Sequence, residues 1–274
     1  QLAELMVGSE LPSPSTETST VTDEVLITVE NLTLPSDGAR PLLDDISFVI
    51  HRGEVLGIAG VEGNGQAELV EAIMGMRPAA TGKVTVVDRD LSTLSTRERR
   101  EAGIGYIPED RQRYGLLLDA PLWENRVLGH QTREPNVNGI FIDKRAARAD
   151  TVRIIEEYDV RTPGPDVLAR ALSGGNQQKL IVGREMSGEP MLLIAAHPTR
   201  GVDVGAQAAI WDQIKRARRE GLAVLLISAD LDELIGLSDR IEVILRGKLV
   251  GEFDPGEVTP EQLGSAMTGA GETA

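Results

Sequence analysis

The 274-residue chain has 28 Lys and Arg residues against 43 Asp and Glu residues, which gives a formal net charge of −15 at pH 7. Such an acidic surface repels nucleic-acid phosphates, and aromatic residues, at 3%, are too few to stack single-stranded bases, so we expect no nucleic-acid partner. The absence of Cys excludes disulfides and thiolate metal sites, and the three His residues lie too far apart in the sequence for a local metal motif.

The N-terminal 22 residues divide into two parts. Residues 1–8 agree with residues 262–269 at a Gln, a Leu, a Met and a Gly, so we expect them to be the tail of a preceding copy of the same domain. Chance agreement between two short amphipathic tails is the alternative. Residues 9–22 are rich in Pro, Ser and Thr and are expected to be a disordered linker, which leaves residues 23–274 as the folded domain.

After the linker, runs rich in Val, Ile and Leu alternate with helical patterns, which indicates an α/β domain with a largely parallel sheet. The apolar runs at 191–195 and 223–227 predict central strands that are buried on both faces. The strands are expected at 25–30, 46–50, 55–59, 83–87, 104–107, 191–195, 223–228 and 240–245. Strand signals stop between about residues 116 and 170, where Asp143 can cap a helix; this segment is interpreted as a helical insertion.

A glycine-rich loop, Gly60-Val-Glu-Gly-Asn-Gly-Gln-Ala67, follows the expected strand at 55–59 and precedes a helical pattern. A turn of this kind presents backbone N–H groups and the positive end of a helix dipole to an anion. Alone it predicts a tight turn without a ligand at least as well, because a phosphate loop usually ends in Gly-Lys-Ser or Gly-Lys-Thr.

Further motifs favour the first interpretation. Leu172-Ser-Gly-Gly-Asn-Gln-Gln-Lys179 stands at the start of a helix, and Pro198-Thr-Arg-Gly-Val-Asp203 follows the strand at 191–195. With the glycine-rich loop and Pro108-Glu-Asp-Arg111, they resemble the nucleotide-binding domain of ATP-binding-cassette (ABC) transporters over residues 25–269. The sequences of these motifs are most similar to those of the second of two fused cassettes in importers of sugars and nucleosides.

The resemblance implies a P-loop NTPase fold, in which a RecA-like α/β core carries a β-rich N-terminal subdomain and a helical subdomain at about residues 116–170. In this family two such domains pair head to tail, and each ATP with its Mg²⁺ lies between the phosphate loop of one and the signature motif of the other. The implied partners are the first cassette of the same polypeptide or a second copy, transmembrane permease subunits and, indirectly, a substrate-binding protein. The implied location is cytoplasmic, on the inner face of the cell membrane.

The resemblance also assigns residues, and several depart from the family pattern. The positions that would face nucleotide are Gly60, Glu62, Gly63, Asn64, Gly65, Gln66 and Ala67. Six positions lack the family's catalytic or metal-binding group: Gln66 (for the phosphate-binding Lys), Ala67 (for the Mg²⁺-binding hydroxyl), Glu109 (for a Gln), Ala196 (for an Asp), His197 (for the Glu that polarises water) and Ala229 (for the switch His).

These departures predict that no residue of this chain is catalytic at its own phosphate loop and that no metal is held there. Phosphoryl transfer depends on positioning and electrostatic stabilisation, so losing several such groups leaves negligible turnover. Backbone N–H groups persist, which leaves residual nucleotide binding open, although Glu109 would oppose it. His197 could orient a water molecule, but a lone His at a strand end is more often structural or solvated. Arg111 and Arg113 are expected to be solvated or to lie between domains.

The signature motif, by contrast, is intact: Leu172, Ser173, Gly174, Gly175, Asn176 and Gln177, followed later by the D-loop residues Gly201, Val202 and Asp203. Ser173 can offer its hydroxyl, and the glycines allow close approach to a phosphate held by another domain. We therefore expect this domain to act in trans. The alternatives are a soluble ABC protein acting on ribosomes or DNA, which the charge opposes, and a regulatory dimerisation module. The motif sequences favour nucleosides over pentoses and hexoses as cargo.

Overall fold

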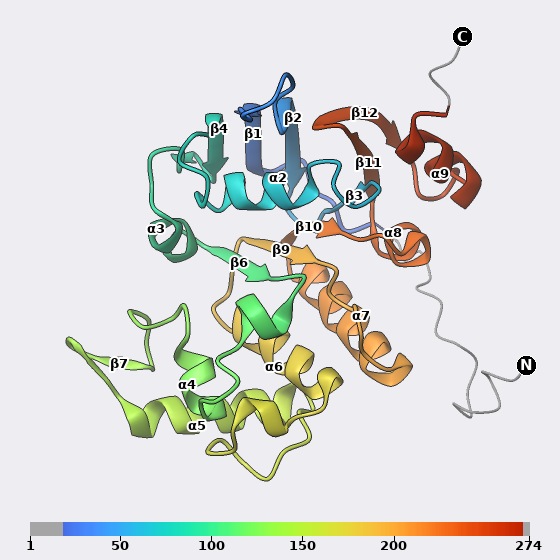
Figure 1. The fold of residues 1–274 in the computed structure, drawn as a ribbon. Helices are drawn as coiled ribbons and strands as arrows, with labels where there is room; N and C mark the ends of the chain where they lie inside the picture. The colour runs from blue at the N-terminus through green and yellow to red at the C-terminus, as the bar shows by residue number, and fades with distance from the viewer. Residues whose placement is uncertain (1–18, 271–274) are drawn as a thin grey trace, which may run out of the picture.

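A mostly parallel six-stranded sheet organises the structure, a computed structural model that describes residues 19–270 (Figure 1). The strand order is β12-β11-β3-β10-β9-β6, and only β12 runs antiparallel to its neighbour. Every residue of β3, β9 and β10 is buried, as the apolar runs predict. The strands are β3 (Val55–Ala59), β6 (Ile104–Ile107), β9 (Leu192–Ala196), β10 (Ala223–Ile227), β11 (Arg240–Leu245) and β12 (Lys248–Phe253).

Helices cover both faces of this sheet. Within β9, Leu192 and Ile194 join one buried cluster while Leu193 and Ala195 join the other, because successive side chains of a strand point to opposite faces. One face packs against α2 (Gln66–Ile73). The other packs against α6 (Gly174–Met186), α7 (Val204–Arg219), α8 (Leu231–Leu237) and α9 (Pro260–Thr268).

A second, antiparallel sheet lies on the α2 side, in the order β2-β1-β4-β5 (Figure 1). Its apolar side chains share one buried cluster with α2 and with β3, so α2 is sandwiched between the two sheets. The strands are β1 (Val25–Leu34), β2 (Leu43–His51), β4 (Thr81–Val86) and β5 (Arg89–Asp90). The expected β-rich N-terminal subdomain is therefore confirmed.

The expected helical subdomain is also present, between β6 and α6. Asp143 caps α5 as predicted, since its carboxylate accepts the N–H groups of Arg145 and Ala146. Strand structure does not stop entirely, however: a hairpin turns at Gly139, and its strands are too short to show an alternating pattern in the sequence. Besides β6, the elements from residue 96 to 171 are α3 (Thr96–Glu101), η1 (Arg111–Gly115), α4 (Leu122–Val127), β7 (Val137–Asn138), β8 (Phe141–Ile142), α5 (Lys144–Glu157) and η2 (Ala169–Ala171).

All eight expected strands are found, and three of them, β3, β6 and β11, have the predicted bounds. One strand of this sheet, β12, was not predicted; it pairs antiparallel with β11 after a tight turn at Arg246 and Gly247. Its residues alternate between exposed and half-buried, so it lacks the apolar run that marks the other strands of this sheet.

Of the 22 N-terminal residues for which a tail and a linker were predicted, the structure describes residues 19–22. Residues 1–8 and residues 9–18 of the expected linker lie outside the described residues. Residues 19–22, the end of that linker, contact the body: the Thr20 hydroxyl donates to the Gly53 carbonyl (3.0 Å) and accepts from Arg218 Nε (3.0 Å), and the Ser19 hydroxyl donates to Asp239 (3.1 Å). No helix within residues 19–270 has both the length and the apolar character needed to cross a bilayer.

A buried carboxylate fastens α6 to the parallel sheet. Glu185, 1% exposed, accepts hydrogen bonds from Arg184 Nε (2.8 Å), Arg100 Nη2 (2.8 Å) and the Tyr106 backbone N–H (3.1 Å). Burial alone would raise the pKa of Glu185, but the guanidinium groups of Arg184 and Arg100 outweigh it and lower the pKa to about 2. The C-terminal end of α6 is thereby tied to α3 and β6.

We predict that Glu185→Gln destabilises the protein by about 3 kcal/mol or more, because it leaves buried guanidinium groups without their counter-charge. The measurement is the free energy of unfolding from urea denaturation at neutral pH. Glu220→Gln is the matched control: Glu220 pairs with Arg216 on an exposed helix surface, so its loss should change the unfolding free energy by about 0.5 kcal/mol or less. Equal losses in the two variants would contradict the role given to Glu185.

His130 predicts an acid-dependent loss of stability. It is 4% exposed, neither ring nitrogen has a hydrogen-bond partner among the described residues, and burial lowers its pKa to about 3. Below the unfolded pKa of about 6.5 the unfolded chain therefore binds a proton that the folded protein refuses, and stability falls by up to about 1.4 kcal/mol per pH unit until the folded pKa is reached. His130→Phe should flatten this slope in urea denaturation between about pH 6.5 and 5; an unchanged slope would contradict it.

Candidate functional site

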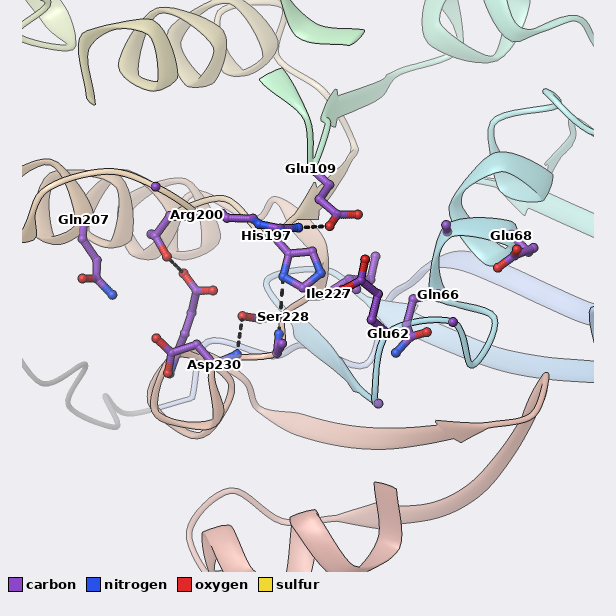
Figure 2. Close-up of a pocket in the computed structure, with 17 residues that line it drawn as sticks. Glu62, Gln66, Glu68, Glu109, His197, Arg200, Gln207, Ile227, Ser228 and Asp230 are labelled. Atoms are coloured by element: carbon purple, nitrogen blue, oxygen red, sulfur yellow. Dashed lines mark hydrogen bonds and ion pairs between the residues drawn. The ribbon is translucent and has the colours of Figure 1, made fainter. Parts of the chain in front are cut away.

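The loops that follow four parallel strands meet at one edge of the sheet. The carboxyl ends of β3, β6, β9 and β10 lie on the same side, so the segments after them converge on a cleft of about 660 Å³ (Figure 2). Five of the six positions that depart from the family pattern line this cleft: Gln66, Ala67, Glu109, His197 and Ala229. The sixth, Ala196, is the buried last residue of β9 and is not part of the lining.

The side chain of Gln66 forms hydrogen bonds to the backbone of the glycine-rich loop to which it belongs. Its Oε1 accepts the backbone N–H of Asn64 (3.1 Å), and its Nε2 donates to the carbonyl of Val61 (3.1 Å). Gln66 is only 9% exposed, and a Cβ on Gly60 would lie 2.5 Å from its Nε2. The Asn64 N–H is therefore already bonded inside the loop rather than turned toward an anion.

The loop is also fastened to the turn between β11 and β12, which the sequence analysis did not anticipate. Asn64 accepts the Arg246 N–H on its side-chain oxygen (3.0 Å) and the Gly247 N–H on its carbonyl (2.8 Å). Of the seven residues expected to face nucleotide, Gly60, Glu62, Gly63, Gln66 and Ala67 line the cleft, but Asn64 and Gly65 do not. Both are turned toward this neighbouring turn instead.

The charges around the cleft are predominantly negative. Arg200 is the one cationic side chain among the described residues of the lining, and it forms an ion pair with Glu109. The other charged residues that line the cleft are all acidic: Glu62, Glu68, Asp230 and Glu233. Because like charges repel at short range, this cleft disfavours a polyphosphate.

The side chains of the cleft also offer little to a Mg²⁺ ion at the positions that the family uses. Ala67 and Ala196 have no side-chain oxygen, and Mg²⁺ requires oxygen ligands. Within residues 19–270, no group of three or more His, Asp and Glu side chains is placed to hold a metal ion. The residues present therefore do not fit the metal that accompanies ATP in this fold.

His197 is held in one orientation at the carboxyl end of β9. Its backbone adopts the left-handed region (φ 48°), its N–H donates to the Ile227 carbonyl (2.7 Å), and its ring Nδ1 accepts the Ala229 N–H (3.4 Å). Burial lowers the pKa of the imidazole, which favours the neutral ring, and the Nδ1 contact then assigns the proton to Nε2. In that tautomer neither nitrogen is free to take a proton from water.

Glu233 is a carboxylate of the cleft wall that the sequence analysis missed. It is 1% exposed, and its Oε1 accepts the Thr199 hydroxyl (2.7 Å) and the Trp211 indole N–H (2.8 Å). These bonds join α7, α8 and the segment after β9, so Glu233 acts as a structural anchor. The only signal in the sequence was an acidic first turn after Asp230, which caps α8.

The signature residues form the N-terminus of α6, outside the cleft lining, and Ser173 is the exposed member among them. The Ser173 hydroxyl oxygen accepts hydrogen bonds from the Asn176 N–H (3.4 Å) and Asn176 Nδ2 (2.9 Å). Both lone pairs are used, so the hydroxyl proton is left to donate outward. Leu172 and Gln177 are buried and support the turn from behind, Gln177 through a bond to the Ala169 carbonyl (3.1 Å).

The D-loop lies between the cleft and the signature. Gly201 lines the cleft with φ 67°, Val202 is half-buried, and Asp203 caps α7 by accepting the Ala206 N–H (2.9 Å). Arg111 is half-buried, and it donates to the carbonyls of Arg200 and Gly201. These two bonds were not predicted, because nothing in the local sequence shows that the loop after β6 lies beside the loop after β9.

The two layers of sheet and helix, the glycine-rich loop at the carboxyl end of β3 and the separate signature at the start of α6 define a nucleotide-binding cassette with the P-loop NTPase fold. Residues 43–200 match the family model described as "ABC transporter", and the chain belongs to this family. Proteins of the family bind ATP with Mg²⁺.

Curated relatives are import ATP-binding proteins. The chain is 41% identical to the "Guanosine import ATP-binding protein NupO" of Bacillus subtilis over 98% of this chain and 53% of that relative. It is 36% identical to the "Ribose import ATP-binding protein RbsA 1" of Rubrobacter xylanophilus over 100% of this chain and 54% of that relative. The chain thus spans about half the length of the curated relatives it matches.

Solved structures share the fold. A nucleotide-free ATP-binding cassette from an ABC transporter superposes with a TM-score of 0.72 at 22% identity, over 89% of this chain and 95% of that one. A dimeric cassette in a post-hydrolysis state, bound to ADP and Pi, also gives 0.72, at 18% identity over 84% and 99%. At these identities the likeness establishes the fold class alone.

We predict that the double variant Gln66→Lys/Ala67→Ser binds ATP–Mg²⁺ at least about tenfold more tightly than the unaltered chain, since each charge-assisted contact contributes roughly 1.5–3 kcal/mol. The change opens the bonded loop and supplies the missing cation and hydroxyl. Isothermal titration calorimetry on the 274-residue chain measures it. Gln207→Lys is the control. Gln207 lines the same cleft from α7, so this substitution adds a positive charge to the cleft but outside the loop. A gain as large in the control would contradict the importance of the loop.

Proposed function

We propose that this chain is the second nucleotide-binding cassette of a tandem ABC importer ATPase for sugars or nucleosides. In this proposal it pairs with the first cassette of the same polypeptide and supplies its signature in trans, while its own glycine-rich loop does not hydrolyse ATP. The ATP and Mg²⁺ that turn over are those bound to the partner's loop.

The observation that carries the proposal is the contrast between the two anion-facing ends of the chain. At the start of α2, the Gln66 amide occupies the loop and the surrounding side chains are acidic. At the start of α6, Ser173 keeps a hydroxyl proton available at an exposed helix N-terminus, where the helix dipole favours an anion. One end is unsuited to a polyphosphate and the other is suited to it.

The hydrogen bonds already made by His197 and Glu233 at the first end support the silent half-site. His197 presents a neutral ring with Nδ1 already bonded, and Glu233 is bonded to Thr199 and Trp211. With these two groups engaged, and with no side-chain oxygen at Ala67 and Ala196 for Mg²⁺, hydrolysis at this loop would lack the positioning and charge stabilisation on which phosphoryl transfer depends.

The tandem arrangement rests on two observations. The chain spans about half of the relatives it matches, and residues 1–8 resemble residues 262–269. We accordingly divide the chain into residues 1–8, the tail of a preceding cassette, residues 9–22, a linker, and residues 23–274, this cassette. A regulatory dimerisation module without a transport role is the alternative that the closed loop favours; the accessible Ser173 hydroxyl opposes it.

A second cleft suggests where a permease subunit would dock. It measures about 300 Å³ and lies between the parallel sheet and the helical subdomain, with Met74, Met76, Tyr106, Tyr114 and Leu128 among its lining. Large apolar side chains in a groove of this kind suit an amphipathic helix of a membrane subunit. The cassette would then lie on the cytoplasmic face of the membrane, and a substrate-binding protein would deliver a sugar or nucleoside to the permease.

We predict that, in the whole polypeptide that carries this chain, Ser173→Arg lowers ATPase activity by roughly 10²-fold or more, because it removes a charge-stabilising donor and blocks the approach of the partner's phosphate. Gln66→Ala should retain most of the activity, since this loop does not turn over ATP. Steady-state phosphate release measures both.

Ser95→Arg is the control for the loss of a helix cap, because Ser95 caps α3 in the same way and is exposed. It should leave the ATPase activity close to that of the unaltered protein. Equal losses in Ser173→Arg and Gln66→Ala would overturn the asymmetry between the two half-sites.

A further inference from the structure

The guanidinium group of Arg111 joins three segments that are far apart in the sequence. Its Nη1 donates to the Arg200 carbonyl (2.7 Å), and its Nη2 donates to the Gly201 carbonyl (3.2 Å). The same Nη2 lies against the signature: a Cβ on Gly174 would stand 2.6 Å from it. The loop after β6, the D-loop and the start of α6 therefore meet at one side chain.

A second contact holds the same two loops together. Glu109, two residues before Arg111, forms an ion pair with the side chain of Arg200. Asp110, between them, accepts the N–H groups of Gln112 and Arg113 (both 3.1 Å) and so fixes the direction of the turn that begins at Arg111. The segment 109–111 thus contacts both the backbone carbonyl and the side chain of Arg200.

The far side of the D-loop is anchored as well. Thr199 donates to the buried carboxylate of Glu233, and Asp203 caps α7. The signature packs onto this anchored segment, because a Cβ on Gly175 would lie 2.9 Å from the Ala206 Cβ and 3.2 Å from Asp203 Oδ2. All of these contacts are between protein groups, so they need no nucleotide.

We infer that Arg111 is a positioning residue that sets the signature and the D-loop in one rigid arrangement. Arginine suits this role because its planar guanidinium group can donate to two carbonyls at once. The same group limits how closely the backbone at Gly174 can approach the D-loop. The consequence for ATP turnover rests on the proposed function: the arrangement presents Ser173 to the phosphate on the partner cassette.

The chain offers a matched control two residues away. Arg113 is exposed, stacks over the Tyr114 ring at 5.1 Å, and donates no side-chain hydrogen bond to a backbone carbonyl among the contacts described for residues 19–270. Arg111→Ala and Arg113→Ala remove the same side chain and the same charge from one turn. Only the first removes the link to the D-loop.

The first test is hydrogen exchange, read by mass spectrometry, on the unaltered chain and the two variants. In Arg111→Ala, amides in residues 199–206 and 174–178 should exchange roughly tenfold faster, because these segments lose a local constraint, while the amides of β3 and β10 keep their protection. Arg113→Ala should match the unaltered chain. Arg111→Lys, which can reach one carbonyl but not two, should fall between them and serves if the Ala variant does not fold. Equal exchange in the Arg111 variants and in Arg113→Ala would overturn the inference.

The second test is ATPase activity in the whole polypeptide. Arg111→Ala should lower kcat by roughly tenfold or more with a smaller change in KM for ATP, since misplacing a positioned group costs rate before it costs binding, and Arg111→Lys should restore part of it. Arg113→Ala should stay within about twofold of the unaltered protein, as a surface change does. If Ser173→Arg leaves activity intact, the proposed function fails. If Ser173→Arg abolishes activity while Arg111→Ala behaves as Arg113→Ala does, the role of Arg111 alone fails.

Discussion

The parallel register of β3, β6, β9 and β10 is the constraint from which the rest of the site follows. These strands run in one direction, so their carboxyl ends lie at the same edge of the sheet. The four loops that follow them are therefore brought together at that edge. Residues far apart in the sequence, such as Glu109, Arg200 and Ala229, become neighbours for this reason. The chemistry at that edge is then decided by the side chains that the loops carry.

Two helix N-termini of this chain have glycines beside them, and their polar side chains make opposite use of their hydrogen bonds. At α2 the polar side chain at the first helical position turns inward and bonds the loop to itself. At α6 the capping side chain accepts its bonds from the helix and keeps its proton for the exterior. The two helix N-termini therefore differ in whether their local hydrogen-bond donors are free.

Much of the fold was predictable, because it depends on patterns that are local in the sequence. Apolar runs located β3, β6 and β11 to the residue, and Asp143 marked the start of α5. The two-stranded hairpin and β12 were missed because short or half-exposed strands show no such run. In the site, motifs identified the residues but not their contacts: the inward turn of Gln66, the bonds of Arg111 and the anchoring of Glu233 arise from tertiary neighbours that sequence spacing does not reveal.

The buried carboxylate of Glu185 fixes one end of α6, so a small change in the angle of the helix would move the residues at its other end. Glu185 fixes the C-terminal end to α3 and β6, while Ser173 stands at the opposite end of a 13-residue helix. A helix of that length extends about 20 Å, so a tilt of roughly 10° about the fixed end would carry the Ser173 hydroxyl by about 3 Å, the length of one hydrogen bond. The position of the signature therefore depends on the angle of α6 as well as on the packing of Gly174 and Gly175 against Arg111 and the D-loop.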